Sequence, residues 1–406
     1  MRDQSEKAEL RRDLSIVQRF ELAEYEFEGA KDILTPALVI YPDFVAANIS
    51  ATIQRLGGDP DRWRPHVKTA KLAFVMRQMM TSGVRNFKAA TTLELRTLCE
   101  LGASDVLMAY PATGYCRKRV AQLAVQYPNT RVSFLVDSVE SALGWKDNAV
   151  GWFVDINPGM NRTGMPERDV LEAVTILGGH KSFRGLHYYD GHIHGDGLGE
   201  AEATKGYARL AELIHLLHDR GIEVPEVVTS GTPTFGAAVD HSPLRTFGSI
   251  HRVSPGTVVY CDVNSLTEVP ATSGYVPAAL VLSTVVSKPG DDMVTCDAGH
   301  KSVSADAGVP TCAVLGHPEF EPQTPSEEHL TIKVNGGFCP SVGDQLYLVP
   351  RHVCPTVNNF DEALLVRNGA IVGIERVSAR GRESPRAGSM GEPFEQREQM
   401  NQHVAK

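Results

Sequence analysis

The chain has 406 residues, 42% of them hydrophobic and 22% charged, which is enough for one large domain, a smaller one and a sizeable core. A net charge of −9 without a basic block argues against a nucleic-acid partner, and no apolar run reaches the roughly 18 residues that a membrane span needs. Seven cysteines without a CxxC pair, and a charged N-terminus without an apolar core, are typical of a cytoplasmic protein.

The first two thirds of the chain predict alternating strands and helices. A charged helical lead-in, 1–34, precedes a strand at 37–41 and a helix at 44–56. Eight short apolar runs then follow, most of them separated by stretches with helical spacing. The predicted strands are 64–67, 87–91, 105–110, 131–136, 151–156, 183–189, 226–230 and 257–260.

This alternation predicts an α/β fold in which residues 35–265 form a closed (β/α)8 TIM-type barrel. An open doubly wound sheet is the alternative, but no Gly-rich phosphate loop follows the first strand. From 266 to 380 short strands follow one another without predicted helices, which indicates a C-terminal all-β domain. Residues 381–406 form a polar tail.

Chemically capable side chains follow several of the predicted barrel strands. In such barrels the chemistry gathers at the C-terminal ends of the strands. Lys68 follows the first strand, Arg162 follows the fifth, and Tyr189, His192 and His194 follow the sixth. A lysine held at a strand end is either a solvated surface charge or an amine for covalent chemistry with a carbonyl, and the strand-end position favours the second interpretation.

Glycines beside hydroxyl residues occur at the last two predicted strands. Such segments offer unhindered backbone N–H groups and a hydroxyl, which suits a phosphate, and barrel phosphate sites are typically built there. Ordinary turn chemistry is the alternative for each segment alone. The predicted phosphate-binding residues are Ser230, Gly231, Thr232, Gly256 and Thr257.

His352 and Cys354 are two residues apart after a predicted strand of the β domain. In extended chain such residues share a side, so an imidazole nitrogen and a thiolate are expected together. Both are good zinc ligands. Two ligands are too few for a structural site, but they suit a catalytic ion whose other positions hold water and substrate. The alternative is a buried cysteine beside a surface histidine.

Together these residues resemble the fold-type III pyridoxal-phosphate enzymes, which share the alanine racemase barrel, and within them the D-threonine aldolase and D-serine dehydratase family. The resemblance covers about residues 35–377. Arg-Pro-His-Val-Lys-Thr at 64–69 is similar to the segment with the Schiff-base lysine, and His-Val-Cys at 352–354 is similar to the shared metal pair. Thr-Thr-Leu-Glu at 91–94 and Asp-Val-Leu-Met-Ala-Tyr-Pro at 105–111 resemble the dehydratases, whereas Pro-Thr-Val-Asn at 355–358 resembles the aldolases. Ala70 stands where the family usually has a second histidine.

The resemblance implies a cofactor, a metal and an assembly. Lys68 would hold pyridoxal 5'-phosphate, Arg162 would contact its phenolic oxygen, and Tyr189 would lie against its ring or ring nitrogen. His352 and Cys354 would bind a divalent metal ion (Zn, Mn or Mg). The protein would be a homodimer whose active site lies between the barrel and the partner's β domain, and its substrate would be a small D-amino acid.

The predicted reaction is retro-aldol cleavage of D-threonine or a related D-3-hydroxy amino acid to glycine and an aldehyde, with His192 or His194 as the base. The runner-up is metal-dependent β-elimination from D-serine or D-3-hydroxyaspartate, which gives a keto acid and ammonia. A racemase, which needs no metal, is a further enzyme alternative. A non-catalytic regulatory protein that binds pyridoxal phosphate is the alternative from another class, and the second domain argues against it.

Overall fold

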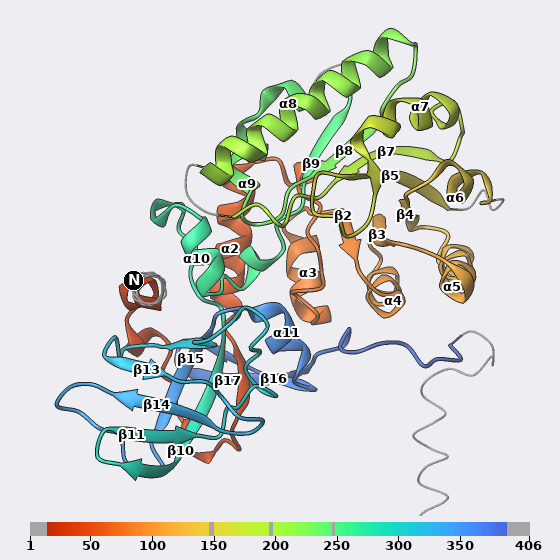
Figure 1. Ribbon diagram of the computed structural model, residues 1–406. Helices are drawn as coiled ribbons and strands as arrows, with labels where there is room; N and C mark the ends of the chain where they lie inside the picture. The colour runs from red at the N-terminus through yellow and green to blue at the C-terminus, as the bar shows by residue number, and fades with distance from the viewer. Residues whose placement is uncertain (1–13, 146–149, 195–197, 246–247, 388–406) are drawn as a thin grey trace, which may run out of the picture.

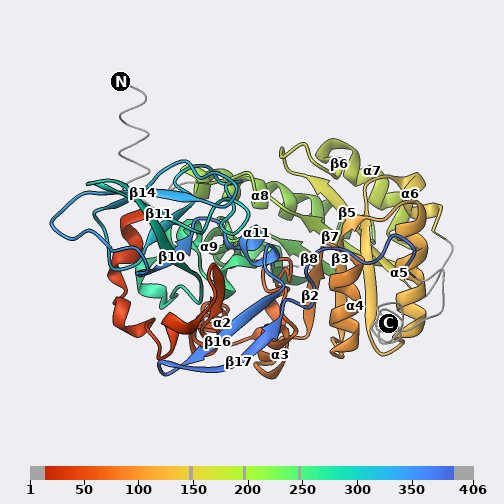
Figure 2. The ribbon, with the colours of Figure 1, turned by 90° about the horizontal axis from the view of Figure 1, so that it is seen from below.

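A computed structural model describes residues 14–145, 150–194, 198–245 and 248–387 of the chain. These residues form a barrel ringed by helices, with a second, mostly β part lying at one end of it (Figures 1 and 2). Among the described residues, no helix combines the length and apolar character that crossing a bilayer requires.

The barrel sheet is parallel. Its strands follow in the order β2-β3-β4-β5-β7-β8-β9, with the two-residue β6 (Met165–Pro166) beside β5. Residues 63–67 close the ring between β9 and β2, because Trp63 bridges Val253 and His66 bridges Lys88. The predicted α/β barrel is therefore confirmed. The strands are β2 (Asn86–Ala89), β3 (Asp105–Pro111), β4 (Arg131–Val136), β5 (Gly151–Asn157), β7 (Phe183–Tyr188), β8 (Glu226–Thr229) and β9 (Ile250–Val253).

Helices cover the outside of this sheet, as Figure 1 shows. Their sequences supply the usual start signals: Pro42 stands at the first position of its helix, and the Thr91 hydroxyl accepts a hydrogen bond from the Glu94 N–H at 3.1 Å. The barrel helices are α2 (Pro42–Arg55), α3 (Ala73–Thr81), α4 (Thr92–Glu100), α5 (Gly114–Gln126), α6 (Val139–Leu143), α7 (Glu167–Leu177), α8 (Leu198–Asp219), α9 (Phe235–Asp240) and α10 (Val263–Glu268).

One predicted barrel strand was wrong, and one predicted strand near the start of the chain belongs to the second sheet. The eighth strand is β9 at Ile250–Val253, whereas residues 257–259 of the predicted strand form a 3-10 helix. The short apolar run Val-Val-Tyr after Gly256 looks like a strand but packs as a buried turn. The strand expected at 37–41 exists as β1 (Ala37–Ile40), but it pairs with β10 and β16 of the second sheet, although the barrel was predicted to begin at residue 35.

The second part is a largely antiparallel sheet, except that β1 runs parallel to β16. The all-β prediction missed one short helix, α11 (Val353–Asn358), which follows His352. The separate apolar core of this part surrounds Val281, Val294 and Leu348. Its strands after β1 are β10 (Ala279–Gly290), β11 (Met293–Cys296), β12 (Cys312–Val314), β13 (Phe320–Pro322), β14 (Leu330–Val334), β15 (Gln345–Pro350), β16 (Glu362–Arg367) and β17 (Ala370–Arg376).

The two ends of the described chain pack on the body of the protein. Residues 14–34 of the predicted helical lead-in form three short 3-10 helices, Ile16–Arg19, Leu22–Glu24 and Ala30–Asp32. At the other end, Glu383 forms ion pairs with Arg96 of α4 and Arg119 of α5. Residues 1–13, and 388–406 of the predicted tail, lie outside the described residues.

A buried ion network closes the N-terminal end of the barrel. Arg64 lies fully buried, with its guanidinium 2.7 Å from Asp105 of β3 and 2.8 Å from Glu226 of β8. Arg252 of β9 contacts the other oxygen of Glu226 at 2.6 Å. This end of the barrel is therefore sealed by paired charges, and the opposite end remains for chemistry.

We expect Arg64→Met to lower the free energy of unfolding by about 3–5 kcal/mol, because it leaves two buried carboxylates short of a partner. Denaturant unfolding followed by circular dichroism measures this change. Arg168→Met, which removes an exposed pair with Asp169, is the matched control and is expected to change it by no more than ~0.5 kcal/mol. Equal effects of the two substitutions would contradict a stabilising role for the network.

Candidate functional site

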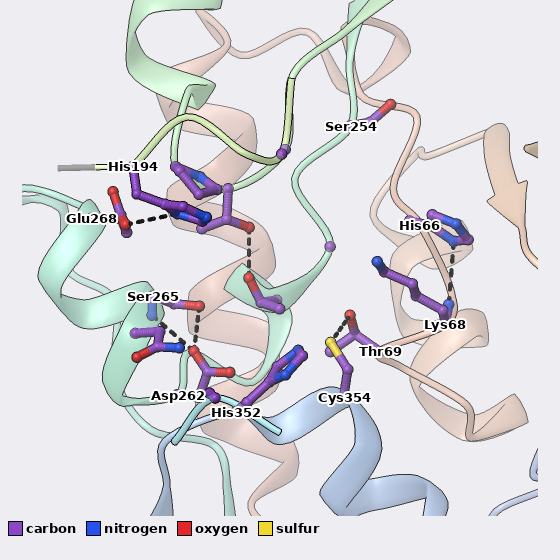
Figure 3. A pocket seen from close by; sticks show the side chains of 18 of the residues that line it. His66, Lys68, Thr69, His194, Ser254, Asp262, Ser265, Glu268, His352 and Cys354 are labelled. Carbon is purple, nitrogen blue, oxygen red and sulfur yellow. Dashed lines mark hydrogen bonds and ion pairs between the residues drawn. The ribbon is translucent and has the colours of Figure 1, made fainter. Parts of the chain in front are cut away.

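A cavity of about 690 Å³ opens where the C-terminal end of the barrel meets the second part of the fold (Figure 3). On the barrel side, the wall comes from the loop after residues 63–67 and from the loops after β7, β8 and β9. On the other side, it comes from α10 and the start of α11. Predicted site residues that line it are Lys68, Tyr189, His194, Gly231, Thr232, Gly256, Thr257, His352 and Cys354.

Lys68 is half-buried, and its side chain points into the cavity (Figure 3). Its Nζ lies 6.0 Å from the centre of the Tyr189 ring. The loop that carries it is held on both sides: the Val67 N–H donates to the carbonyl of Lys88 at 2.9 Å, and the Tyr260 hydroxyl donates to the carbonyl of Ala70 at 2.7 Å. The amine is thus presented from a fixed backbone.

Two buried hydroxyls beside the cavity lack a hydrogen-bond partner among the described residues. They are Ser230 Oγ, at the end of β8, and Ser254 Oγ, at the end of β9. Ser230 also adopts a left-handed backbone conformation with φ of 64°, which is uncommon for a residue other than glycine. Buried polar groups are normally satisfied, so these hydroxyls indicate a missing acceptor such as a phosphate oxygen.

Glycine is required where the backbone of this region approaches its neighbours. A Cβ at Gly256 would lie 2.9 Å from the carbonyl oxygen of His66, in the loop of Lys68. A Cβ at Gly231 would lie 3.2 Å from the Tyr189 ring. These glycines therefore hold the hydroxyl loops against Lys68 and Tyr189, and the residues present fit the phosphate and ring of pyridoxal phosphate.

His352 and Cys354 both point into the cavity from the opposite wall (Figure 3). They were expected to share one side of an extended segment. In fact His352, in extended conformation, is the N-cap of α11, and Cys354 lies in the first turn of that helix. The Cys354 sulfur lies 3.0 Å from the Thr69 hydroxyl, next to Lys68 in sequence. The pair therefore faces the amine across the cavity.

Neighbouring carboxylates orient this pair. Asp306 lies 2.6 Å from His352 Nδ1, which leaves Nε2 for another partner. Asp262 is buried and accepts a hydrogen bond at 2.8 Å from the N–H of Val353, between the two residues. A carboxylate behind the imidazole, together with an adjacent thiol, is a donor set that suits zinc. Among the described residues, however, no cluster of three or more His, Cys, Asp or Glu side chains forms a metal-binding group.

Three predicted residues lie beside the cavity and do not line it: Ser230, Arg162 and His192. Arg162 is exposed, with its guanidinium carbon 5.0 Å from the centre of the Tyr189 ring. His192 packs against the loop that contains Gly159, and its Nδ1 is buried without a partner among the described residues. Of the two predicted bases, His194 is the one in the cavity wall, and its contact with Glu268 at 3.5 Å raises its pKa.

The residues of the cavity wall that were not predicted as site residues include His66, Ser254 and Asp262. Burial and the charges of Lys68 and Lys88 lower the pKa of His66 well below its usual value, so this imidazole is neutral near pH 7. The alternation of a strand offered a signal for it, because His66 stands two residues before Lys68. Ser254 was missed because the eighth strand was predicted after it, at 257–260. Asp262 was missed because it lies in a turn, which has no periodic sequence pattern.

Two family models together cover most of the chain. The model described as "Alanine racemase, N-terminal domain" matches residues 40–263, more than half of the chain. The chain belongs to the alanine racemase N-terminal domain family. This family has the fold-type III barrel of pyridoxal-phosphate proteins, as the resemblance predicted. A second model, "Putative serine dehydratase domain", matches residues 278–366 in the β part.

Several known proteins resemble this chain over most of its length. A D-threonine aldolase from Arthrobacter sp. is 27% identical, over 86% of this chain and 93% of that protein. A D-threo-3-hydroxyaspartate dehydratase from Delftia sp. (strain HT23) is 24% identical, over 84% and 97%. The crystal structure of D-threonine aldolase from Filomicrobium marinum matches with a TM-score of 0.76 and 26% identity, over 86% and 97%.

Proposed function

We propose that this protein is a pyridoxal-phosphate- and metal-dependent lyase that cleaves D-3-hydroxy amino acids such as D-threonine to glycine and an aldehyde. One observation carries the proposal: an amine and a pair of potential metal ligands lie on opposite walls of the same cavity. The amine is that of Lys68, on the barrel side, and the ligands are His352 and Cys354. The similarity to an aldolase and a dehydratase that act on hydroxy amino acids supports the substrate class.

Pyridoxal phosphate, when bound, supplies an aldehyde that joins to amines and a ring that withdraws electrons from the substrate's α-carbon. Lys68 is the amine within the cavity that would hold the aldehyde and then release it to the substrate. Ser230, Ser254 and the N–H groups near Gly256 would hold the phosphate. Tyr189 would lie against the ring or its nitrogen, and Arg162, whose guanidinium carbon is 5.0 Å from the centre of the Tyr189 ring, would contact the phenolic oxygen.

A divalent ion, when held by His352 and Cys354, would act as a Lewis acid toward the substrate's hydroxyl. Burial lowers the pKa of His352, but the hydrogen bond and charge of Cys354 and the charges of Asp262 and Asp306 outweigh it and raise the pKa to about 10. The donors therefore lie in negative surroundings that a cation would neutralise. Asp306 and Asp262 keep the two side chains aimed at the cavity.

Retro-aldol cleavage requires a base that removes the proton from the β-hydroxyl while the Cα–Cβ bond breaks. His194 remains the predicted base that lines the cavity. His66 is a second histidine in the wall; its lowered pKa keeps the ring neutral near pH 7, and its Nδ1 accepts a hydrogen bond from the Lys68 N–H at 3.4 Å. His192 does not line the cavity, so it is the weakest of the three.

β-Elimination is the second candidate. Lys68 would then take the α-proton, and the hydroxyl would leave with the help of the metal. Cys354 favours this alternative, because the thiol ligand resembles that of the zinc-dependent dehydratases. The matching of the β part to a serine dehydratase model favours it as well.

Incubation with D-threonine, D-serine and D-3-hydroxyaspartate separates these reactions. We expect glycine and acetaldehyde from D-threonine, measured by an aldehyde reductase coupled assay and by amino-acid analysis. Keto acid and ammonia without glycine would show that the protein catalyses β-elimination and not retro-aldol cleavage. Racemisation of the substrate that continues after treatment with a chelator would favour a racemase. Binding of the cofactor without any turnover would favour the regulatory alternative.

The proposed assembly is a homodimer in which the partner's β part completes the cavity. Within one chain, the cavity lies between the barrel and that chain's own β part, whereas the resemblance implied the partner's β domain on that side. The cytoplasmic location likewise remains a prediction.

A further inference from the structure

A second lysine lies close to Lys68 and plays no part in the predicted site. Lys88 stands on β2 and is only 2% exposed. Its Nζ lies 2.9 Å from Nε2 of His187, on β7. The other ring nitrogen of that histidine, Nδ1, lies 2.7 Å from Asp155 of β5. Asp155 also accepts a hydrogen bond from the Thr163 hydroxyl at 2.8 Å. A continuous hydrogen-bonded chain therefore crosses the barrel interior and ends at a lysine.

The direction of this chain follows from its charges. Burial raises the pKa of Asp155, but the hydrogen bond from His187 and further contacts outweigh it and lower the pKa, so the carboxylate is charged and can only accept. Burial and the charge of Lys88 lower the pKa of His187 to about 4, so its ring is neutral near pH 7. His187 Nδ1–H then donates to Asp155, and Nε2 accepts a hydrogen bond from Lys88 whether or not the amine is charged.

Positive groups surround Lys88 on the side of the cavity. Three cations lie around the Tyr189 ring: Lys88 Nζ at 5.4 Å from the ring centre, Lys68 Nζ at 6.0 Å and the Arg162 guanidinium carbon at 5.0 Å. His66 of the first strand also feels the charge of Lys88.

Burial, and after it this surrounding positive charge, weakens the hold of Lys88 on its proton. Burial and the positive charges of Lys68, Arg64 and Arg162 lower the pKa of Lys88 to about 7, although the negative charge of Asp155 acts in the opposite direction. An amine in this position is therefore close to losing its proton until negative charge arrives.

We propose that Lys88 is a positioning residue for the anionic cofactor, and that it takes up a proton when pyridoxal phosphate binds beside Tyr189. The inference rests on the proposed cofactor and adds the coupling between that cofactor and a proton. His187 and Asp155 hold the amine 5.4 Å from the centre of the Tyr189 ring, where Lys88 would supply a buried positive charge to the anionic cofactor. Its low exposure keeps it from competing with Lys68 for the aldehyde.

The sign of the resulting pH dependence is fixed by linkage. Negative charge raises the pKa of Lys88 in the loaded protein above its value in the free protein. The extra affinity due to Lys88 is therefore fully present below about pH 7, and it declines by up to about tenfold per pH unit as the pH rises above 7. Lys88→Met, which is neutral at every pH, lacks this decline.

Titration calorimetry of the cofactor-free protein with pyridoxal phosphate measures the proton directly. At pH 8, in buffers of different ionisation enthalpy, we expect wild type to take up nearly one proton more than Lys88→Met. Protons from the cofactor and from Lys68 cancel in this difference. Lys88→Arg is expected to lose this proton uptake and to keep tight binding without the decline due to Lys88. It therefore answers the same question if Lys88→Met does not fold.

His251→Gln is the matched control, because His251 is a buried neutral histidine of the same barrel that contacts the Thr229 hydroxyl at 2.8 Å. It is expected to match wild type in proton uptake. Equal uptake in wild type, Lys88→Met and Lys88→Arg would overturn the inference while leaving the cofactor assignment intact. If wild type does not bind pyridoxal phosphate at all, the proposed function itself fails.

Discussion

Lys68→Ala is expected to abolish the absorbance band of covalently held pyridoxal phosphate and to lower kcat/KM for D-threonine cleavage by at least about 10³-fold. Lys68 is the lysine that lines the cavity, whereas nearby Lys88 is 2% exposed and hydrogen-bonded to His187. Spectra of the cofactor-loaded protein and the rate of aldehyde release measure the two effects.

The matched control is Lys181→Ala, which removes an exposed lysine between α7 and β7. It is expected to keep the wild-type spectrum and rate. An unchanged spectrum in Lys68→Ala would show that this amine does not hold the cofactor.

Cys354→Ala is expected to lower metal-dependent turnover by about 10²-fold or more while pyridoxal phosphate stays bound. The thiol faces the cavity beside His352 and is not among the groups proposed to hold the phosphate, so its loss is expected to affect the metal and spare the cofactor. A strong chelator added to wild type is expected to cause the same loss, reversed by added zinc or manganese. Turnover and bound metal content are the measurements.

Cys116→Ala is the control for loss of a thiol, because Cys116 is a half-buried residue of α5 outside the cavity wall. It is expected to retain full turnover and sensitivity to the chelator. Full activity of Cys354→Ala, with normal metal content, would mean that this thiol only fills space.

The sequence predicted the barrel because seven of its strands are short apolar runs between helices. It misplaced the eighth because Val258, Val259 and Tyr260 are as apolar as a strand, and only tertiary packing turns them into a 3-10 helix. β1 has an ordinary strand pattern, and its pairing with β10 across more than 200 residues leaves no local signal.

Much of the site was also predictable, because residues at strand ends meet at one end of a barrel. Lys68, Tyr189, Gly231 and Gly256 were found in this way. His352 and Cys354 converge as predicted, but through a helix N-terminus in place of a strand. His192 does not line the cavity: it lies within the turn that the Ile193 N–H closes onto the Asp190 carbonyl, and His194 follows that turn.

The two-residue alternation of side chains along a strand could have predicted that Lys88 points into the barrel. It lies between Phe87 and Ala89, both buried, so strand alternation places the charged side chain in the barrel interior. Its partners His187 and Asp155 also alternate with apolar residues on their strands. The sequence does not show that the three meet, since this depends on the closure of the barrel.

Borohydride reduction of the cofactor-loaded protein, followed by peptide mapping, shows which lysine holds pyridoxal phosphate. We expect the reduced pyridoxyl label on Lys68, in the peptide that contains Arg-Pro-His-Val-Lys-Thr. A label on Lys88 or on another lysine, or no label at all, would contradict this assignment.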